Sequence, residues 1–497
     1  MPEALLAPIA GLDTLDDATC AALRARLREA GFTSEALDDA EVIAPMMTTA
    51  LRMPLVRVHL KRRPGPASTL LAVFVYHFDV AASDLREALG DALYRSALDA
   101  RLIDERADGR ASSRWLLLPF GRDWYLSDPL ENGEEAVMGP GMTTVLLHGW
   151  SEAFDAKRVL DLGCGAGSLA VAAALRGAHA VAADLNERAL AVARFNARLN
   201  GVTIETRGGD VAETAKGEEF DLVLAQPPYF AQPESEPGST YLHGGRYGDE
   251  LALRFVSAAA RRLAPGGTAL VLFDFAQREG ALVGEKLREA VGDAEVTTLA
   301  ITRPSLPLDL NAAHTAAWHH PSLGPEYEAA ATAYREHFHA LGIQALTSVL
   351  VVLRRPRSAD EPRWRVVLPH SGAKPPSPEA LRDQLRSMDA AGKPDAALLP
   401  LTLVPARGAR FQGEWAHPAD PDPLRLKVVF DTGSFGSDRE LGAGGWHLFA
   451  LFDGSRTLAD VVREHAQEAE LDASEAAKEA IGFAREGLAR GLLRVAD

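Results

Sequence analysis

Two short segments combine residue types that can do chemistry. The first is an apolar strand, Arg158–Leu162, that runs into a small-residue helix start through a loop. That loop carries three alternate glycines, Gly163, Gly165 and Gly167. Glycines let the backbone approach a ligand closely because no Cβ stands in the way. The second segment is the apolar strand Phe220–Ala225, which ends in a polar turn. This turn reads Gln226, Pro227, Pro228 and Tyr229. The pair predicts a ligand-binding loop beside a turn that can orient a substrate.

Acidic side chains flank the glycine loop where the polar groups of a bound nucleoside would lie. Asp161 stands two residues before Gly163, and Asp184 ends the next predicted strand. An acidic residue at the end of that second strand accepts hydrogen bonds from ribose hydroxyls. The glycine spacing, G-x-G-x-G, is tighter than the dinucleotide fingerprint G-x-G-x-x-G. A dinucleotide-binding domain with a divergent fingerprint is therefore the alternative interpretation.

Together, the glycine loop and the Gln-Pro-Pro-Tyr turn resemble class I S-adenosylmethionine (SAM) methyltransferases. Within them, the chain is similar to the "methyltransferase small-domain" branch, which methylates nitrogen. The resemblance implies SAM as the cofactor. The residues that it implies for SAM binding are Thr143, Asp161, Gly163, Cys164, Gly165, Gly167, Asp184, Leu185, Asp210, Val211 and Gln226.

The resemblance also implies a catalytic role for the turn Gln226, Pro227, Pro228 and Tyr229. Related enzymes carry Asn, Asp or Ser first, and that oxygen accepts hydrogen bonds from the substrate amino group. The nitrogen lone pair is thereby aimed at the methyl group, which is catalysis by positioning. Gln226 departs from the pattern because its amide oxygen lies one methylene further out, which leaves room for a different acceptor. A turn that is only structural, in a SAM-binding regulator without activity, is the alternative.

Three neighbouring segments add candidate contacts. The loop Gly139–Thr144 is predicted to close over the methionine end of SAM, or else to be a plain interdomain turn. The glycine- and aromatic-rich loop Tyr241–Gly248 could cover the substrate. Its candidate contacts are His243, Arg246 and Tyr247. Four histidines could be imagined as metal ligands, namely His319, His320, His337 and His339. Without cysteines or a carboxylate pattern beside them, no metal site is predicted.

The order of the apolar segments predicts the fold class. Strand and helix alternate from about residue 145, which indicates a parallel sheet covered on both faces. The seven strand candidates are Arg158–Leu162, Ala180–Ala183, Thr203–Arg207, Leu222–Ala225, Thr268–Phe273, Val296–Thr302 and Thr347–Leu353. The prediction is an α/β protein: a Rossmann-like, seven-stranded class I methyltransferase core with N-terminal winged-helix-like and C-terminal α+β appended domains. The expected boundaries are residues 1–144 for a substrate domain, 145–355 for the methyltransferase, 356–385 for a linker and 386–497 for the C-terminal domain.

The flanking domains carry weaker signals. Helical segments at 15–40 and 83–101 precede a predicted hairpin of Trp115–Leu118 and Trp124–Leu126, which suggests the winged-helix-like module. Near the other end, the run Asp453–Leu458 resembles PqqD-like and related small winged-helix modules. Such modules can bind leader peptides by strand addition.

Composition narrows the partners. The net charge of −17 argues against a broad phosphate-binding surface, because nonspecific nucleic-acid affinity comes from Lys and Arg. The densest basic run is Lys61, Arg62 and Arg63. With two cysteines and neither a signal peptide nor a membrane-spanning run, we expect a cytoplasmic protein without a membrane or metal partner. The substrate is predicted to be macromolecular, with an RNA base and a protein or peptide amide left unresolved. A small natural product is the alternative acceptor.

Overall fold

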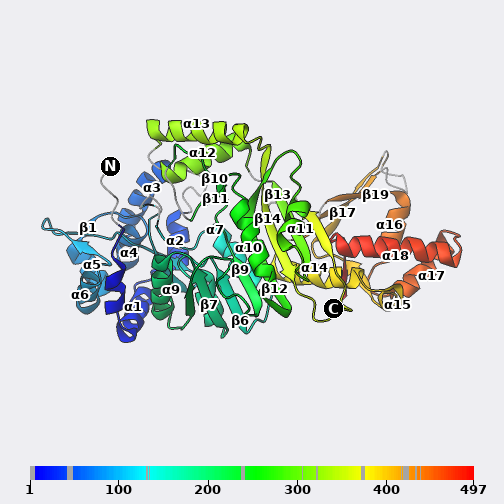
Figure 1. Cartoon of the computed structure of the whole chain (residues 1–497), viewed down its shortest axis with the longest axis horizontal. Coiled ribbons are helices and arrows are strands. Elements are labelled where there is room, and N and C mark those ends of the chain that lie inside the picture. The colour runs from blue at the N-terminus through cyan, green and yellow to red at the C-terminus, as the bar shows by residue number, and fades with distance from the viewer. Residues whose placement is uncertain are drawn as a thin grey trace.

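The chain folds into three units arranged along one long axis (Figure 1). In this computed structural model the described residues are 6–41, 49–129, 133, 135–236, 241–304, 306–320, 323–370, 375–415, 417, 425–430, 434–436 and 438–496. The N-terminal unit lies at one end, the large mixed sheet in the middle and the C-terminal unit at the other end (Figure 1). The middle unit positions the candidate site.

The central sheet has eight strands, and the strands in its middle are mostly apolar. Their bounds are β6 (Arg158–Leu162), β7 (His179–Asp184), β8 (Glu205–Gly208), β9 (Phe220–Ala225), β12 (Leu263–Gln277), β13 (Thr297–Pro304), β14 (Ala345–Arg354) and β15 (Arg365–Pro369). Their spatial order is β15-β13-β14-β12-β9-β6-β7-β8, and β14 alone runs antiparallel to its neighbours in this sheet. The predicted seven-stranded, Rossmann-like core is confirmed.

The eighth strand comes from the segment that was expected to be a linker. Within residues 356–385, β15 pairs in parallel with β13 along its whole length. Helix α14 (Pro378–Ala391) begins in the same segment and packs its apolar side against the sheet cluster through Leu381 and Leu385. Val366 and Leu368, which face the sheet cluster from β15, and an amphipathic α14 explain why this part of the segment is built into the core.

Helices cover both faces of the sheet. One face carries α10 (Glu250–Ala260) and α11 (Val283–Val291), whose apolar residues join one buried cluster. The other face carries α7 (Met142–Ser151), α8 (Ser168–Leu175) and part of α9 (Glu187–Asn200), which share a second cluster. Side chains of a strand alternate between the two faces, so each strand supplies both clusters.

A helical pair stands above the carboxyl ends of the strands. Helices α12 (Leu308–His319) and α13 (Pro325–Ala340) connect β13 to β14 and pack on each other (Figure 1). Their shared core includes Tyr334 and Phe338, together with residues of β12 and of the short strand β10 (Phe230–Ala231). The insertion thereby reaches the turn that follows β9.

The N-terminal unit is mostly helical. Its helices are η1 (Ile9–Thr14), α1 (Asp17–Glu29), α2 (Ser34–Glu41), α3 (Thr49–Arg62), α4 (Pro66–Phe74), α5 (Ala82–Leu89) and α6 (Asp91–Asp99). The expected helical segments are therefore each divided in two. A three-stranded sheet in the order β1-β3-β2 uses β1 (Val80–Ala81), β2 (Asp104–Glu105) and β3 (Arg110–Ser112).

The predicted hairpin forms, but it has a different place from the one expected. Strands β4 (Leu116–Phe120) and β5 (Asp123–Ser127) make a separate two-stranded sheet. Two side-chain amides of α9, Asn196 and Asn200, bond its backbone: Asn196 Oδ1 accepts from Leu126 N at 2.7 Å. The hairpin is thus fixed to the central unit instead of completing the N-terminal sheet.

The C-terminal unit combines a small sheet with helices. Strands β17 (Ala409–Glu414), β18 (Arg425–Phe430) and β19 (Arg439–Leu441) form one sheet, and β16 (Leu403–Pro405) pairs with β20 (Leu493–Val495). Helices α15 (Asp395–Leu398), α16 (Ala443–Ala450), α17 (Leu458–Glu468) and α18 (Ala473–Ala489) complete it. The unit is anchored to α14, where Gln384 Nε2 donates to Leu488 O of α18 at 3.2 Å.

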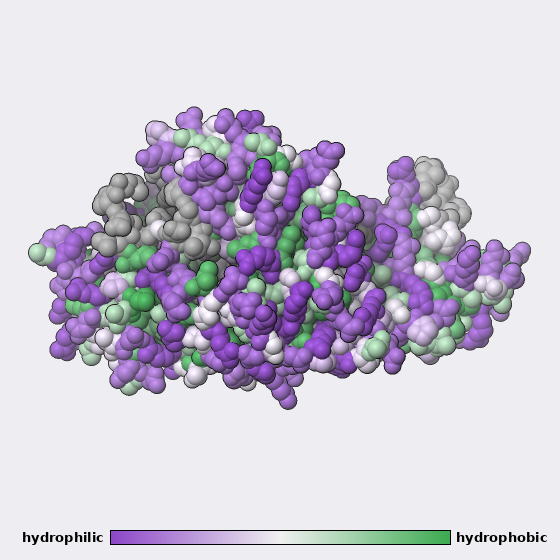
Figure 2. Space-filling view, in the orientation of Figure 1, coloured by the Kyte–Doolittle hydropathy of each residue, from purple (hydrophilic) through white to green (hydrophobic). Residues whose placement is uncertain are grey.

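The face shown in Figure 2 is mostly hydrophilic, and its apolar residues form scattered groups instead of one continuous patch. Among the described residues, no helix combines the length and apolar character needed to cross a bilayer.

Candidate functional site

One large cavity, of about 940 Å³, opens at the carboxyl ends of β6, β7, β9 and β12. Ligands of open α/β sheets bind at this edge. The predicted site residues that line it are Thr143, Asp161, Gly163, Cys164, Gly165, Asp184, Leu185, Asp210, Val211, Gln226, Pro227, Pro228 and Tyr229. The structure therefore brings together residues from five separate segments of the chain. Among the residues that the resemblance implies for cofactor binding and catalysis, Gly167 is the one that does not line the cavity.

Gly163 and Gly167 are required for different packing reasons. Gly163 has φ +74°, and a Cβ there would lie 2.8 Å from the ring of Phe255, so the loop tolerates no side chain at this point. Gly167 has φ +73°, and a Cβ there would lie 2.6 Å from the Cβ of Ala193 on α9. Gly167 therefore permits the close approach of α9, and its place in the cofactor site stays a prediction.

Asp184 ties the glycine loop to the end of β7. Its two carboxylate oxygens accept from backbone N–H groups, from Gly165 at 2.9 Å and from Asn186 at 2.9 Å. Burial raises the pKa of Asp184, although these backbone bonds favour the charged form. The side chain is held in one orientation at the cavity wall.

Asp161 is buried more deeply, with 2% of its surface exposed. It accepts from Ala170 N at 3.0 Å, at the first turn of α8. Burial raises its pKa to about 8, and the nearby Asp184 charge adds to this. A buried carboxylate without a cation costs free energy when ionised, so a cationic ligand in the cavity would be stabilised here.

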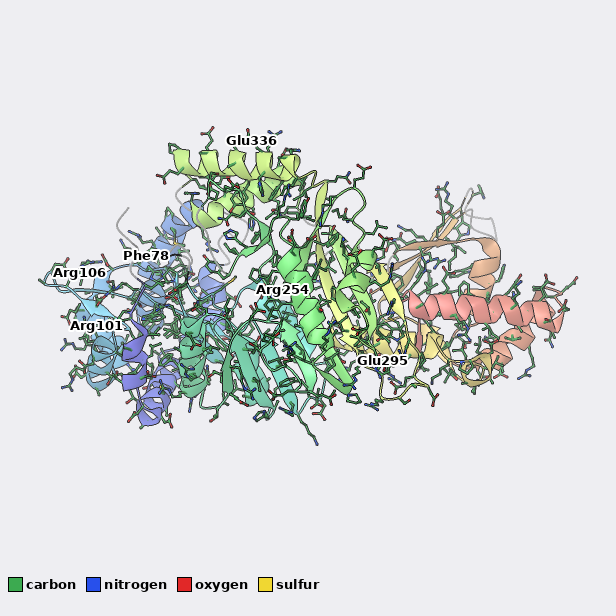
Figure 3. The ribbon with its side chains drawn as sticks, in the orientation of Figure 1. Phe78, Arg101, Arg106, Arg254, Glu295 and Glu336 are labelled. Atoms are coloured by element: carbon green, nitrogen blue, oxygen red, sulfur yellow. The ribbon has the colours of Figure 1, made fainter. Side chains whose placement is uncertain are left out.

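Three more predicted residues lie around these carboxylates. Leu185 is 70% exposed at the cavity wall, which offers an apolar platform. The Asp210 carboxylate is held by Arg254 of α10 at 2.9 Å, and Figure 3 labels that arginine at the centre of the middle unit. The Cys164 thiol is buried, which raises its pKa well above the usual value. A thiol in that state is a small wall residue and not a reactive nucleophile.

The segment before α7 closes one side of the cavity. Glu135, Val137 and Met138 line it, and Met138 O accepts from Ala166 N of the glycine loop at 3.2 Å. Asn186 Nδ2 also donates to Glu135 O at 2.9 Å. The chain that leaves the N-terminal unit is thus bonded directly to the glycine loop.

A buried ion pair holds this wall in place. Arg188 of α9 donates through Nε to Asp128 Oδ2 at 2.8 Å, and its second terminal nitrogen bonds the other oxygen at 2.5 Å. The same Asp128 accepts from Val137 N at 2.9 Å. Asp128 is fully buried, and the Arg188 guanidinium lies 4.8 Å from the centre of the Trp115 ring.

The Gln226 side chain is held by the loop that begins α7. Thr144 Oγ1 donates to Gln226 Oε1 at 3.2 Å, and the same hydroxyl accepts from Gly141 N at 3.2 Å. The Gly139–Thr144 loop therefore contacts the turn directly, and it lines the cavity as well.

Tyr229 lies under the loop that runs from Tyr241 to Gly248. Phe230 N donates to Leu242 O at 2.7 Å, and a short parallel pairing joins β10 to β11 (His243–Gly245). Gly248, at φ +92°, passes so close to the turn that a Cβ would lie 2.5 Å from Tyr229 O.

The residues of this loop that line the cavity are Tyr241 and Leu242, and not the three that were predicted. His243, Arg246 and Tyr247 lie outside the lining. The Tyr247 ring instead stacks under Arg278, 4.0 Å from its guanidinium carbon.

Sequence reasoning missed three polar residues on the side of the turn away from the glycine loop. Asp274 from β12 and Asn311 and His314 from α12 line the same cavity. Asn311 is 5% exposed and accepts from Thr315 Oγ1 at 3.3 Å. The one available signal was the three-residue spacing of Asn311 and His314, which places them on one helix face.

The histidines considered as metal ligands are spread over the helical insertion. His320 contacts Glu236 at 3.2 Å, and His339 lies 4.0 Å from Asp309. Among the described residues, no three His, Cys, Asp or Glu side chains converge in a way that could hold a metal ion.

The site geometry agrees with comparisons to known proteins. Residues 141–300 match the family described as "Methyltransferase small domain". The matched region, residues 141–300, is thus similar to a methyltransferase small domain. This domain covers the strands from β6 into β13, and so contains the glycine loop, both carboxylates and the turn. The helical insertion, β14 and the two flanking units lie outside it.

Curated relatives match over the same region. A release factor glutamine methyltransferase of Deinococcus radiodurans is 36% identical over 149 residues, which are 28% of this chain and 52% of the relative. One from Bordetella pertussis is 35% identical over 143 residues, 27% of this chain and 53% of the relative. The chain thus spans about half the length of these curated relatives. Among solved structures, TrmN from Thermus thermophilus is similar at 20% identity and a TM-score of 0.27, covering 42% of this chain and 48% of that chain.

Proposed function

We propose that the protein is a SAM-dependent N-methyltransferase that acts on an amide or amino nitrogen of a macromolecule. The observation that carries the proposal is a single cavity that joins the carboxylate-flanked glycine loop to the Gln226–Tyr229 turn. A dinucleotide-binding domain would have no use for that turn.

The cavity residues fit SAM. Gly163 and Gly165 line the cavity at positive φ with no side chain between backbone and ligand, and Asp184 stands at the end of β7, where a ribose would be bonded. Thr214 Oγ1 is buried at the cavity wall without a hydrogen-bond partner in the described structure, beside Gly209, where a nucleobase polar group would satisfy it. Asp161 suits the cationic amino-acid end of the cofactor.

Methyl transfer needs positioning above all. SAM supplies an electrophilic methyl group on a sulfonium, and the C–S bond breaks as the nitrogen attacks. The chain's own residues hold the acceptor: Tyr229 offers a ring face, and Gln226 is fixed by Thr144 at the edge of the turn. The wall at 135–144 and the loop at 241–242 cover the site on two sides and so limit the access of water.

Within the macromolecular class, a protein amide is favoured over an RNA base. Among the described residues, the cavity lining contains no lysine and one arginine, Arg188, which is paired with Asp128. The described lining therefore has no uncommitted cationic side chain that could bind an RNA phosphate. In the N-terminal unit, Arg106 and Arg101 (labelled in Figure 3) lie beside Asp79 and Asp104. Arg63 of the basic run pairs with Asp39. The two curated relatives are named for glutamine methylation.

The flanking units are proposed to select the substrate. The order α4-β1-α5-α6-β2-β3, with the sheet order β1-β3-β2, supports a winged-helix-like N-terminal module. The Asp453–Thr457 start of α17 supports the PqqD-like interpretation of the C-terminal unit. Both cysteines, Cys20 and Cys164, are free, which suits the proposed cytoplasmic location.

Calorimetry with SAM tests the cofactor. We expect micromolar binding by the full chain and at least a hundredfold loss in Asp184→Ala, because both loop bonds to Gly165 and Asn186 disappear with the cofactor contact. Asp293→Ala, which removes a carboxylate with 95% of its side chain exposed, is the matched control. Unchanged affinity in Asp184→Ala would show that the cofactor site is wrong.

The substrate class is tested with methyl-labelled SAM and a fractionated lysate. Label that protease releases and nuclease leaves intact supports the protein amide. Label with the opposite sensitivity supports an RNA base, and label in small molecules alone supports the natural-product alternative. Binding of SAM without any label would favour the SAM-binding regulator.

A further inference from the structure

The acceptor side of the cavity contains a carboxylate that the cofactor does not need. Strand β12 extends beyond β9: Val271 pairs with Ala225, the last residue of β9, and Asp274 lies three residues further. Asp274 is therefore level with the Pro228–Tyr229 turn, and it lines the cavity. Asp161 and Asp184 belong to the opposite side, on β6 and β7.

Across the sheet, Ser348 of β14 lies in register between this carboxylate and Arg303 of β13. Ser348 hydrogen bonds the Asp274 carboxylate, and Tyr229 lies close enough to feel its charge. The nearest candidate cation in sequence, Arg278, is engaged by Asp249, with Nη1–Oδ2 at 2.9 Å. Burial raises the pKa of Asp274 to about 6, which keeps it largely ionised at neutral pH.

The other polar groups of the site already have partners. Gln226 Oε1 accepts from Thr144, and both oxygens of Asp184 accept from backbone N–H groups. Thr144 thus ties the longer Gln226 side chain to the α7 loop through one lone pair of its amide oxygen, which leaves the other lone pair for the acceptor. A second acceptor group beside the turn would share the hold on the substrate nitrogen.

Helix α12 completes a subsite around Asp274. Asn311 and His314 lie three residues apart on the helix and line the cavity with Leu306. The groups that meet here are one carboxylate, one amide, one imidazole and apolar walls. Such a set favours a neutral or cationic N–H group, and it disfavours an anion because of the carboxylate.

We propose that Asp274 accepts a hydrogen bond from the N–H of the acceptor nitrogen and receives its proton during methyl transfer. This inference rests on the proposed function. When the nitrogen forms its bond to the methyl carbon, the C–S bond breaks and its electron pair stays on sulfur. The N–H proton then passes to the Asp274 carboxylate, so that the nitrogen ends neutral and the acid is protonated. A carboxylate that titrates near 6 is suited to this transfer at neutral pH.

The test measures ligand charge preference, and it needs no knowledge of the natural substrate. The full chain is saturated with S-adenosylhomocysteine, which covers Asp161 and Asp184. Three probes of matched size, propylammonium, propionamide and propionate, are then titrated by ligand-detected NMR. We expect wild-type protein to bind propylammonium at least tenfold more tightly than propionate, with propionamide between them. Equal binding of propionate and propylammonium would overturn the proposal.

Variants assign that preference to one side chain. Asp274→Asn is expected to weaken propylammonium binding about tenfold, and Asp274→Glu to retain the preference, which separates lost charge from lost folding. Asp293→Asn on the exposed surface is the control and should match wild type. An unchanged preference in Asp274→Asn contradicts the proposal. If S-adenosylhomocysteine does not bind, titrations without it, compared between wild type and Asp274→Asn, decide the same question.

The same proteins distinguish this inference from the proposed function. Calorimetry with S-adenosylhomocysteine should give equal affinity for wild type and Asp274→Asn, since Asp274 is not a cofactor contact. Failure of wild type to bind S-adenosylhomocysteine removes the proposed function. Normal binding together with an unaltered probe preference in Asp274→Asn removes only the role of Asp274.

Discussion

The cofactor half of the cavity and its acceptor half hold their polar groups in different ways. In the cofactor half, Asp184 and Asp161 accept hydrogen bonds from backbone N–H groups of the adjoining loops. In the acceptor half, Gln226 and Asp274 are held by the side chains of Thr144 and Ser348. Backbone partners survive almost any nearby substitution, whereas side-chain partners are lost with a single one.

This difference matches what each half must do. The cofactor is the same in every reaction cycle, and backbone geometry at the strand ends already fixes the wall that binds it. Little conformational entropy is therefore lost when the cofactor binds. A variable acceptor is served by side chains from segments that differ between proteins, here the α7 loop, β12 and the helical insertion. Substitutions should therefore be able to impair cofactor binding and acceptor positioning separately.

The largest effect is expected at the ion pair behind the cofactor wall. Arg188→Met leaves Asp128 buried without its partner and should destabilise the protein by about 3–5 kcal/mol. SAM affinity should fall as well, because Asp128 also holds Val137 at the wall. Urea unfolding, with hydrogen exchange at residues 128–138, measures both the size and the place of the loss.

A matched control exists on the same helix. Arg194 is an exposed α9 arginine that bonds Thr206 Oγ1 at 3.0 Å, so Arg194→Met should cost well under about 1 kcal/mol. Similar losses in the two variants would mean that the wall does not depend on the buried pair.

A smaller effect, on turnover alone, is expected in the acceptor half. Gln226→Ala should lower turnover about 10²-fold, as for the loss of one positioning hydrogen bond, with SAM affinity nearly intact. Thr144→Val removes only the hydroxyl that holds Gln226 and should lower turnover about tenfold. Labelled-methyl assays and calorimetry are run side by side, with the exposed Gln412→Ala as control. A parallel loss of SAM affinity would mean that the two halves are not independent.

A further effect is a pH-dependent gain in stability. Burial raises the folded-state pKa of Asp161 to about 8, above its unfolded value, so its contribution to stability is lost as the pH rises towards and through 8. Asp161→Asn does not titrate and keeps an oxygen for Ala170 N. Between about pH 5 and pH 9, the ligand-free variant should therefore become progressively more stable than wild type.

The affinity of Asp161→Asn for SAM should be lower than that of wild type, because the variant has no negative charge to pair with a cationic ligand. Thermal melting without ligand and calorimetry with SAM check the two parts. A ligand-free variant whose stability relative to wild type falls as the pH rises would contradict the burial argument.

The cofactor half and the core around it could be predicted from local sequence patterns. Gly163, Gly165, Asp184 and the apolar strands are local features, because strand, tight turn and helix start lie within a few residues of each other. The strand order then places Gln226 beside them, since β9 is the direct neighbour of β6. Alternation of strand and helix was enough to predict that arrangement.

The acceptor half and the outer parts depend on contacts between segments that are far apart in the sequence. Asp274 is an ordinary acid inside an apolar strand until the register with β9 and β14 places it beside the turn. Gly167 looks like its two neighbours until Ala193 of α9 is found against it. The sequence analysis placed strand β15 in a linker and the hairpin β4–β5 in the N-terminal module. Their actual partners, β13 and α9, lie far away in sequence. Contacts between distant segments carry no local pattern, and these contacts built the half of the cavity that meets the acceptor.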